Sequence, residues 1–81
     1  SEMCIRDSII PKQHIKSAAE ITPENSAVVS KIFEAAAKIA KQFDLKDGFR
    51  IVNNCGECAG QTVKHLHFHM LGGRDFGWPA G

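Results

Sequence analysis

The sequence predicts one small domain that combines a single long helix with antiparallel strands, and two apolar patterns carry this prediction. Between residues 23 and 44, apolar side chains recur at spacings of three and four, which is the period of a helix with one buried side. Between residues 65 and 70, histidines instead alternate with apolar side chains, which is the period of a strand. A chain of 81 residues suits one such domain with a modest core.

The helix is predicted to begin at Pro23 and to end at Phe43 or Asp44. Thr22 can cap its first turn, and proline fits the first helical position because its missing N–H is not needed there. Gly48 lies where a turn releases the chain. The apolar stripe that should face the core comprises Val28, Val29, Ile32, Phe33, Ala36, Ile39, Ala40 and Phe43.

Shorter extended segments flank this helix. Ile9 and Ile10 precede Pro11 and look like the tail end of a strand, since a residue before proline favours extended geometry. Residues 49–53 have β-type side chains and lead through a short glycine-containing loop into the histidine segment. Two strands joined by so short a loop should pair antiparallel. Residues 1–6 show neither period.

The histidine segment is the strongest functional signal of the chain. In a strand, His65, His67 and His69 would share one face because successive side chains point to opposite sides. The other face would then be apolar, with Leu66, Phe68 and Met70. Such a strand is buried on one side and lined with imidazoles on the other.

Imidazole supports more than one chemistry near neutral pH, because it can be base, acid, nucleophile or metal ligand. A metal site is therefore an alternative to catalysis. Histidines at positions i and i+2 of a strand lie about 6.5–7 Å apart at the backbone, so their rings can converge on one ion. Three ligands from one strand do so less comfortably than ligands from several elements. A purely structural role for the row is the third interpretation.

Composition narrows the class of protein. The net charge of +1 gives no argument for bulk binding to nucleic acid or to a membrane surface. No apolar run is long enough to span a bilayer, and the first residues lack the apolar core of a signal peptide, so a cytoplasmic location is expected. Three cysteines make no disulfide framework, and Cys55 and Cys58 are interpreted as two loop thiols in a reducing compartment.

Five segments together resemble one known family. They are Ile10–Ile15, Phe49–Asn54, Gly60–Val63, His65–Arg74 and Trp78–Pro79. The His-x-His-x-His pattern with an upstream Gly-Gln-Thr is similar to the histidine triad (HIT) superfamily, and within it to the HINT-like branch of purine nucleoside phosphoramidases.

The resemblance implies an α+β fold in which a HIT-like antiparallel sheet packs against one long helix. It also implies that N-terminal strands, which carry much of the purine and ribose pocket in the family, are missing before Ile9. We therefore interpret residues 9–81 as a partial HIT domain. Residues 1–8 are interpreted as a non-native or disordered leader, because Met3–Asp7 resembles the translation of an adapter used in sequencing libraries.

The resemblance further implies hydrolysis of nucleoside 5′-phosphoramidates of the AMP-amide type, through a covalent nucleotidyl-histidine intermediate. His67 matches the family nucleophile, His65 is expected to orient its ring, and His69 is expected to donate to a phosphoryl oxygen. Substrate contacts are expected from Asn54, Gln61, Thr62 and Trp78. From the residues alone, Asn54 could instead be a turn residue and Thr62 a solvent-facing threonine.

No cofactor and no bound metal are expected. His14 and His65 are minor metal candidates, because some family members bind zinc with such histidines and a cysteine pair in the region missing here. The expected partners are purine nucleoside monophosphate derivatives and a second copy in a homodimer, without nucleic acid or membrane. Two other functions stay open: a catalytically impaired HIT fragment that only binds nucleotide or a partner, and a small metal-binding protein that uses the histidine row.

Overall fold

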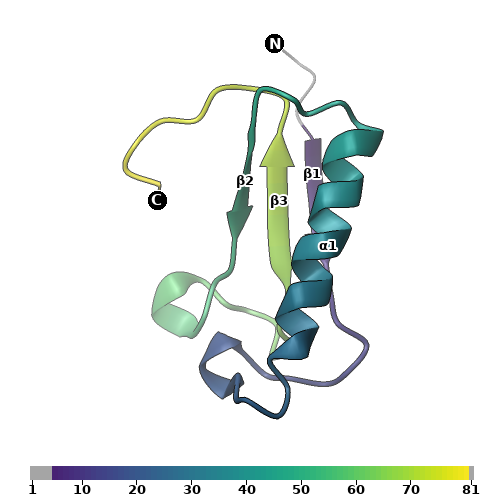
Figure 1. Ribbon diagram of the computed structural model, residues 1–81. Coiled ribbons are helices and arrows are strands. Elements are labelled where there is room, and N and C mark those ends of the chain that lie inside the picture. Colours follow the sequence, from purple (N-terminus) through teal and green to yellow (C-terminus); the bar gives the residue numbers. More distant parts are fainter. Residues whose placement is uncertain (1–4, 81) are drawn as a thin grey trace.

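The computed structural model describes residues 5–80, and it has an α+β architecture. Three strands form an antiparallel sheet, and one long helix packs across one of its faces (Figure 1). The elements in chain order are β1 (Ile5–Ile9), the short 3-10 helix η1 (Ala18–Glu20), α1 (Ala27–Gln42), β2 (Phe49–Val52), the short 3-10 helix η2 (Glu57–Ala59) and β3 (Phe68–Gly72). The prediction of one long helix with antiparallel strands is confirmed.

The histidine strand β3 is the central strand, and the order of the sheet is β1-β3-β2. Ile9 lies opposite Phe68 in the pairing of β1 with β3, and Val52 lies opposite His69 in the pairing of β2 with β3. Because β2 and β3 run antiparallel, the start of β3 and the end of β2 lie at the same end of the sheet. That end carries the histidine segment.

The core lies between α1 and the apolar side of the histidine segment. Leu66 and Met70 are fully buried, and the Phe68 ring meets the Phe33 ring edge-on with a centroid distance of 6.2 Å. The buried apolar residues are Ile15, Ile32, Ala36, Leu66, Phe68 and Met70. Burial alternates residue by residue from His65 to the end of β3, as predicted from the sequence.

The helical stripe is less buried than expected, since Phe33 and Phe43 are 49% and 47% exposed. The reason is the width of the sheet: three strands under one helix cover only part of its apolar arc. Ile32 and Ala36 at the middle of the stripe are the buried residues of the helix.

The helix begins at Ala27, and the prediction of a start at Pro23 with Thr22 as the cap is wrong. Asn25 competes for this segment, because its side chain accepts a hydrogen bond from the Thr22 N–H at 2.7 Å and donates one to the Glu20 carbonyl at 3.1 Å. Asparagine side chains that bond nearby backbone groups favour turns over helix. Residues 23–26 are therefore turns that lead into the helix.

The third strand begins at Phe68, and the prediction that His65 and His67 lie within the strand is wrong. Its neighbours explain the limit. In the register of β1 with β3, the next pairs would match His67 with Ile10 and Leu66 with Pro11, and proline has no N–H for the ladder. His65 and His67 thus precede the strand, although they keep its alternation.

Part of the segment interpreted as a leader is a strand. Residues 5–8 belong to β1 and pair with β3, so this stretch has a defined place in the sheet, whereas residues 1–4 lie outside the described residues. Sheet pairing uses backbone groups, which any sequence other than proline supplies. The non-native origin of residues 1–8 remains a prediction. Within residues 5–80, no helix has the length and apolar character to cross a membrane.

Candidate active site

The imidazole of His67 is held by a hydrogen bond to its own segment. Its Nδ1 lies 2.8 Å from the backbone carbonyl oxygen of His65, and His67 is half-buried. A carbonyl oxygen only accepts, so Nδ1 must carry the proton. In the neutral ring the lone pair is then on Nε2, which is the form that a nucleophilic or basic histidine requires.

The ring of His65 points to a different set of partners. Its Nε2 lies 3.1 Å from the carbonyl oxygen of Pro11, so Nε2 is the donor. Its Nδ1 then accepts a hydrogen bond from Nδ1 of His14, at 3.1 Å. His65 therefore contacts His67 through its backbone carbonyl, while its ring ties the segment to residues 11–14.

His69 is the one member of the row inside β3, on the face of the sheet opposite α1. Its ring is perpendicular to that of His67, with a centroid distance of 5.0 Å. A shallow cavity of about 350 Å³ opens there, lined by Ser8, Val52, His69 and Leu71. The rings of His67 and His69 are thus neighbours on this face, whereas the His65 ring bonds residues 11–14.

The side chain of Gln61 is committed to the backbone around it. Its Nε2 donates to the carbonyl oxygens of Lys16 at 2.7 Å and Val63 at 3.0 Å, and its Oε1 accepts from the N–H of Gly56 at 2.9 Å. Gly56 and Gly60 have φ angles of 87° and 91°, a region that favours glycine. Gln61 therefore fastens the η2 loop to the segment before η1.

The other predicted substrate residues lie at separate places. Asn54 is half-buried and follows the end of β2, so it lies at the same end of the sheet as His67. Thr62 is exposed in the segment before the histidines. Trp78 is 89% exposed in the C-terminal tail. The structure thus groups Asn54, Gln61 and Thr62 around one loop and leaves Trp78 apart from it.

Two residues that the sequence analysis did not single out organise these segments. Asn53 donates through Nδ2 to the carbonyl oxygen of His67 at 2.8 Å. Arg50 donates to the carbonyl oxygen of Gly77 at 2.8 Å, and its guanidinium lies 4.8 Å from the centre of the Phe76 ring, so it holds the tail that carries Trp78. From the sequence, an asparagine at the end of a strand is interpreted as a turn residue. No sequence pattern predicts the contact of Asn53 with His67 or that of Arg50 with the tail.

The described residues contain no cluster of side chains that could bind a metal ion. Between residues 5 and 80, no three histidine, cysteine, aspartate or glutamate side chains gather closely enough to hold one. His14 and His65 are joined directly to each other, which makes at most two ligands. Cys55 and Cys58 are exposed free thiols in the η2 loop.

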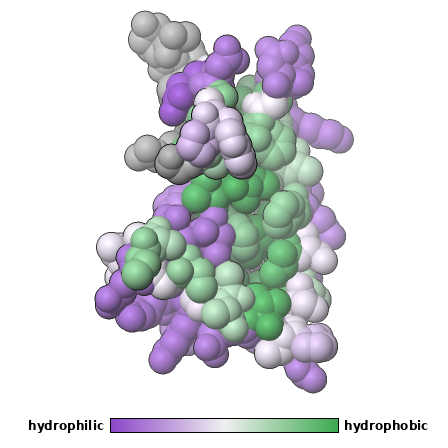
Figure 2. All heavy atoms as spheres, turned by 90° about the vertical axis from the view of Figure 1, so that its left-hand side faces the viewer, coloured by the Kyte–Doolittle hydropathy of each residue, from purple (hydrophilic) through white to green (hydrophobic). Residues whose placement is uncertain are grey.

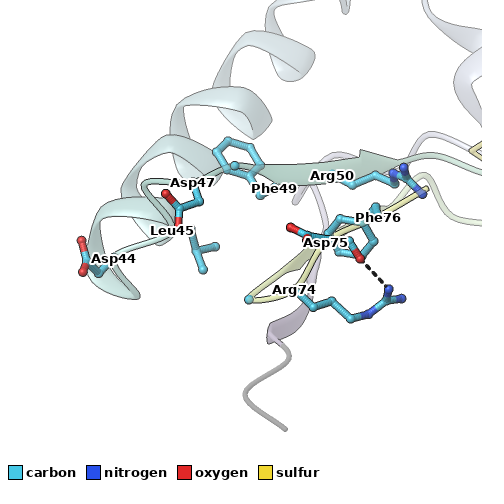
Figure 3. Close-up of a pocket in the computed structure, with 10 residues that line it drawn as sticks. Asp44, Leu45, Asp47, Phe49, Arg50, Arg74, Asp75 and Phe76 are labelled. Carbon is cyan, nitrogen blue, oxygen red and sulfur yellow. Dashed lines mark hydrogen bonds between the residues drawn. The ribbon is translucent and has the colours of Figure 1, made fainter. Parts of the chain in front are cut away.

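A cavity of about 870 Å³ lies at the other end of the sheet from His67 (Figure 3). It is bordered by the turn between α1 and β2 and by the turn after β3. Figure 3 shows Arg74, Asp75 and Phe76 on one side of it, with the Arg74 guanidinium 4.4 Å from the centre of the Phe76 ring. None of the predicted catalytic or substrate residues lines this cavity, so we place the candidate site at the histidines.

A comparison with protein-family models identifies the relatives of this chain. The model described as "HIT domain" matches residues 8–76. The chain belongs to the HIT family. The HIT match includes all three histidines of the row and the η2 loop, so the resemblance drawn from the sequence is confirmed.

The chain spans about two thirds of the length of several HIT relatives. Uncharacterized HIT-like proteins of Synechococcus elongatus and Synechocystis are 45% and 42% identical over 73 residues, which is 90% of this chain and 64% of each relative. A HIT family hydrolase of Legionella pneumophila superposes with a TM-score of 0.89 and 38% identity, over 94% of this chain and 69% of that structure. A histidine triad nucleotide-binding protein of Candida albicans superposes with a TM-score of 0.72 and 29% identity, over 94% of this chain and 60% of that structure.

Proposed function

We propose that this chain carries the catalytic histidines of a hydrolase that acts on nucleoside 5′-phosphoramidates of the AMP-amide type. The observation that carries the proposal is the hydrogen bond from His67 Nδ1 to the His65 carbonyl oxygen, which leaves the lone pair on Nε2. Similarity to a HIT family hydrolase and to a histidine triad nucleotide-binding protein supports the coarser part of the proposal, hydrolysis and the binding of a nucleotide.

The reaction would proceed in two displacements at phosphorus. In the first, His67 Nε2 attacks phosphorus, the bond from phosphorus to the amine nitrogen breaks, and the leaving amine takes up a proton from solvent. In the second, a water oxygen attacks the same phosphorus, the bond to Nε2 breaks, and the attacking water gives up a proton to solvent. The products are a nucleoside monophosphate and an amine, and a covalent step of this kind divides one difficult displacement into two easier ones.

His69 would stabilise the charge that develops on the phosphoryl oxygens. Its ring lies 5.0 Å from that of His67, so one phosphoryl group can contact both imidazoles. Asn54, Thr62 and the backbone of the η2 loop are proposed to contact the remaining phosphate oxygens. Gln61 would act mainly by shaping this loop, because its amide already makes three backbone hydrogen bonds.

Nucleotide binding without turnover is the alternative proposal, and similarity to a histidine triad nucleotide-binding protein supports it. The base and ribose of a nucleotide need apolar walls and polar groups beyond a phosphate end.

A homodimer is proposed from the surface beside β2. Figure 2 shows a band of apolar atoms down this side of the molecule, between hydrophilic groups. The strand β2 forms one edge of the sheet, and Phe49 at its start is 40% exposed. Exposed apolar bands next to a free strand edge mark association surfaces. Light scattering at several protein concentrations tests this proposal.

The test of the proposed activity is the hydrolysis of adenosine 5′-phosphoramidate by the wild type and by His67→Ala. We expect the variant to lose turnover by about 10⁴-fold or more, the range seen when a nucleophile is removed. Lys46→Ala is the matched control, since Lys46 is exposed at the other end of the sheet. Equal rates in the wild type and His67→Ala would contradict the proposal, and nucleotide binding without turnover in the wild type would favour the alternative.

A further inference from the structure

Asn53 occupies a particular position between β2 and the nucleophile of the proposed reaction. The backbone ladder between β2 and β3 ends at the pair of Val52 and His69. Asn53 is the next residue, and its side-chain amide continues the pairing by donating from Nδ2 to the carbonyl oxygen of His67 at 2.8 Å. The orientation of the amide is fixed, because a carbonyl oxygen accepts and only the NH₂ group can donate to it.

This contact fixes the part of His67 that the strand itself does not hold. His67 lies outside β3, and its ring is oriented by a bond to the carbonyl oxygen of His65 in the same irregular segment. That segment is itself tied to residues 11–15, by the His65 ring and by the Leu66 N–H, which donates to the Ile15 carbonyl oxygen. The amide of Asn53 ties the His67 peptide to the end of a separate strand, so ring and backbone are anchored at two independent points.

We infer that Asn53 is a positioning residue that keeps Nε2 of His67 aimed at the reacting phosphorus by hydrogen-bonding the His67 carbonyl. The inference rests on the proposed function for its effect on rate. Its structural part, the control of the His67 ring, is independent of any activity. The amide of Asn53 is occupied by the protein backbone, so the residue acts through His67 and its loss should lower kcat with little change in KM.

Two variants separate hydrogen bonding from shape. Asn53→Leu keeps the size of the side chain and removes the donor without adding charge. Asn53→Asp keeps the shape even more closely and also removes the donor. If the donated hydrogen bond orients the His67 ring, both variants lose that orientation. If only the packing of the side chain matters, Asn53→Asp behaves as the wild type does. Asn25→Ala is the control, because Asn25 also bonds backbone groups but lies in the turn before α1.

The first readout is the tautomer of His67 in the chain as it exists, measured by long-range ¹H–¹⁵N NMR at a pH where imidazoles are neutral. We expect separate Nδ1–H and Nε2 signals in the wild type and in Asn25→Ala. In Asn53→Leu and Asn53→Asp the two ¹⁵N shifts should move toward each other, as they do when tautomers mix. Wild-type shifts in either Asn53 variant would overturn the inference.

The second readout is steady-state hydrolysis of adenosine 5′-phosphoramidate. Loss of one positioning hydrogen bond should lower kcat about three- to tenfold at constant KM in both Asn53 variants. A change confined to KM would overturn the positioning role. If the wild type does not hydrolyse the substrate, the proposed function fails while the NMR result still decides the inference about Asn53.

Discussion

Replacing Gln61 by alanine should release the η2 loop from the rest of the domain. The substitution removes three hydrogen bonds, to Gly56, Lys16 and Val63. A neutral hydrogen bond contributes about 0.5–1.5 kcal/mol, and these are partly exposed, so we expect a loss of about 1.5–3 kcal/mol. A domain of this size rarely has more than about 5 kcal/mol of stability, so the variant should be clearly destabilised.

Urea unfolding and amide hydrogen exchange measure this effect together. We expect a lower midpoint at constant m value, and faster exchange of the Gly56 amide, whose partner is the Gln61 side-chain oxygen. Lys64→Ala is the control, because Lys64 is exposed three residues further along the same segment. Unchanged exchange at Gly56 in Gln61→Ala, with the control also unchanged, would refute the role of Gln61 as the fastening of the loop.

Further predictions concern the histidines, nucleotide affinity and zinc. His65→Ala should cost less activity than His67→Ala, because alanine keeps the carbonyl that accepts from His67 Nδ1; equal losses in steady-state assays would contradict this. AMP should bind weakly and with little preference over CMP, since the predicted contacts belong to the phosphate end of a nucleotide; calorimetry that finds micromolar AMP binding and clear rejection of CMP would show a base pocket. Zinc should be neither required nor tightly bound; elemental analysis that finds about one zinc per chain, lost in Cys55→Ser and Cys58→Ser, would overturn this.

Patterns that depend on burial were the ones that the sequence could predict. The alternation around Leu66, Phe68 and Met70 could be predicted because one face of the segment is buried in the core and therefore has apolar residues. The central part of the helix could be predicted for the same reason. The start of β3 did not, because it is set by where the neighbouring strands end, a property of other segments.

The candidate site was predicted in outline and not in its connections. The histidine row located it, and the resemblance supplied a nucleophile. The contacts of Asn53 and Gln61 with backbone carbonyls could not be predicted, because they join residues 14 and 45 positions apart in the sequence. The turn made by Asn25 likewise displaced the predicted helix start, since a side chain competed with the backbone for its hydrogen bonds.

The central claim is that Nε2 of His67 forms a bond to phosphorus. The reaction with adenosine 5′-phosphoramidate is quenched rapidly in base, which preserves a bond between histidine nitrogen and phosphorus. Mass spectrometry of the peptides then identifies the histidine that carries the phosphorus. We predict a nucleotidyl group on His67 in the wild type and in Lys46→Ala, and its absence in His67→Ala. A nucleotidyl group on His65 or His69, or full turnover with no labelled histidine under conditions that trap such adducts, would contradict the account.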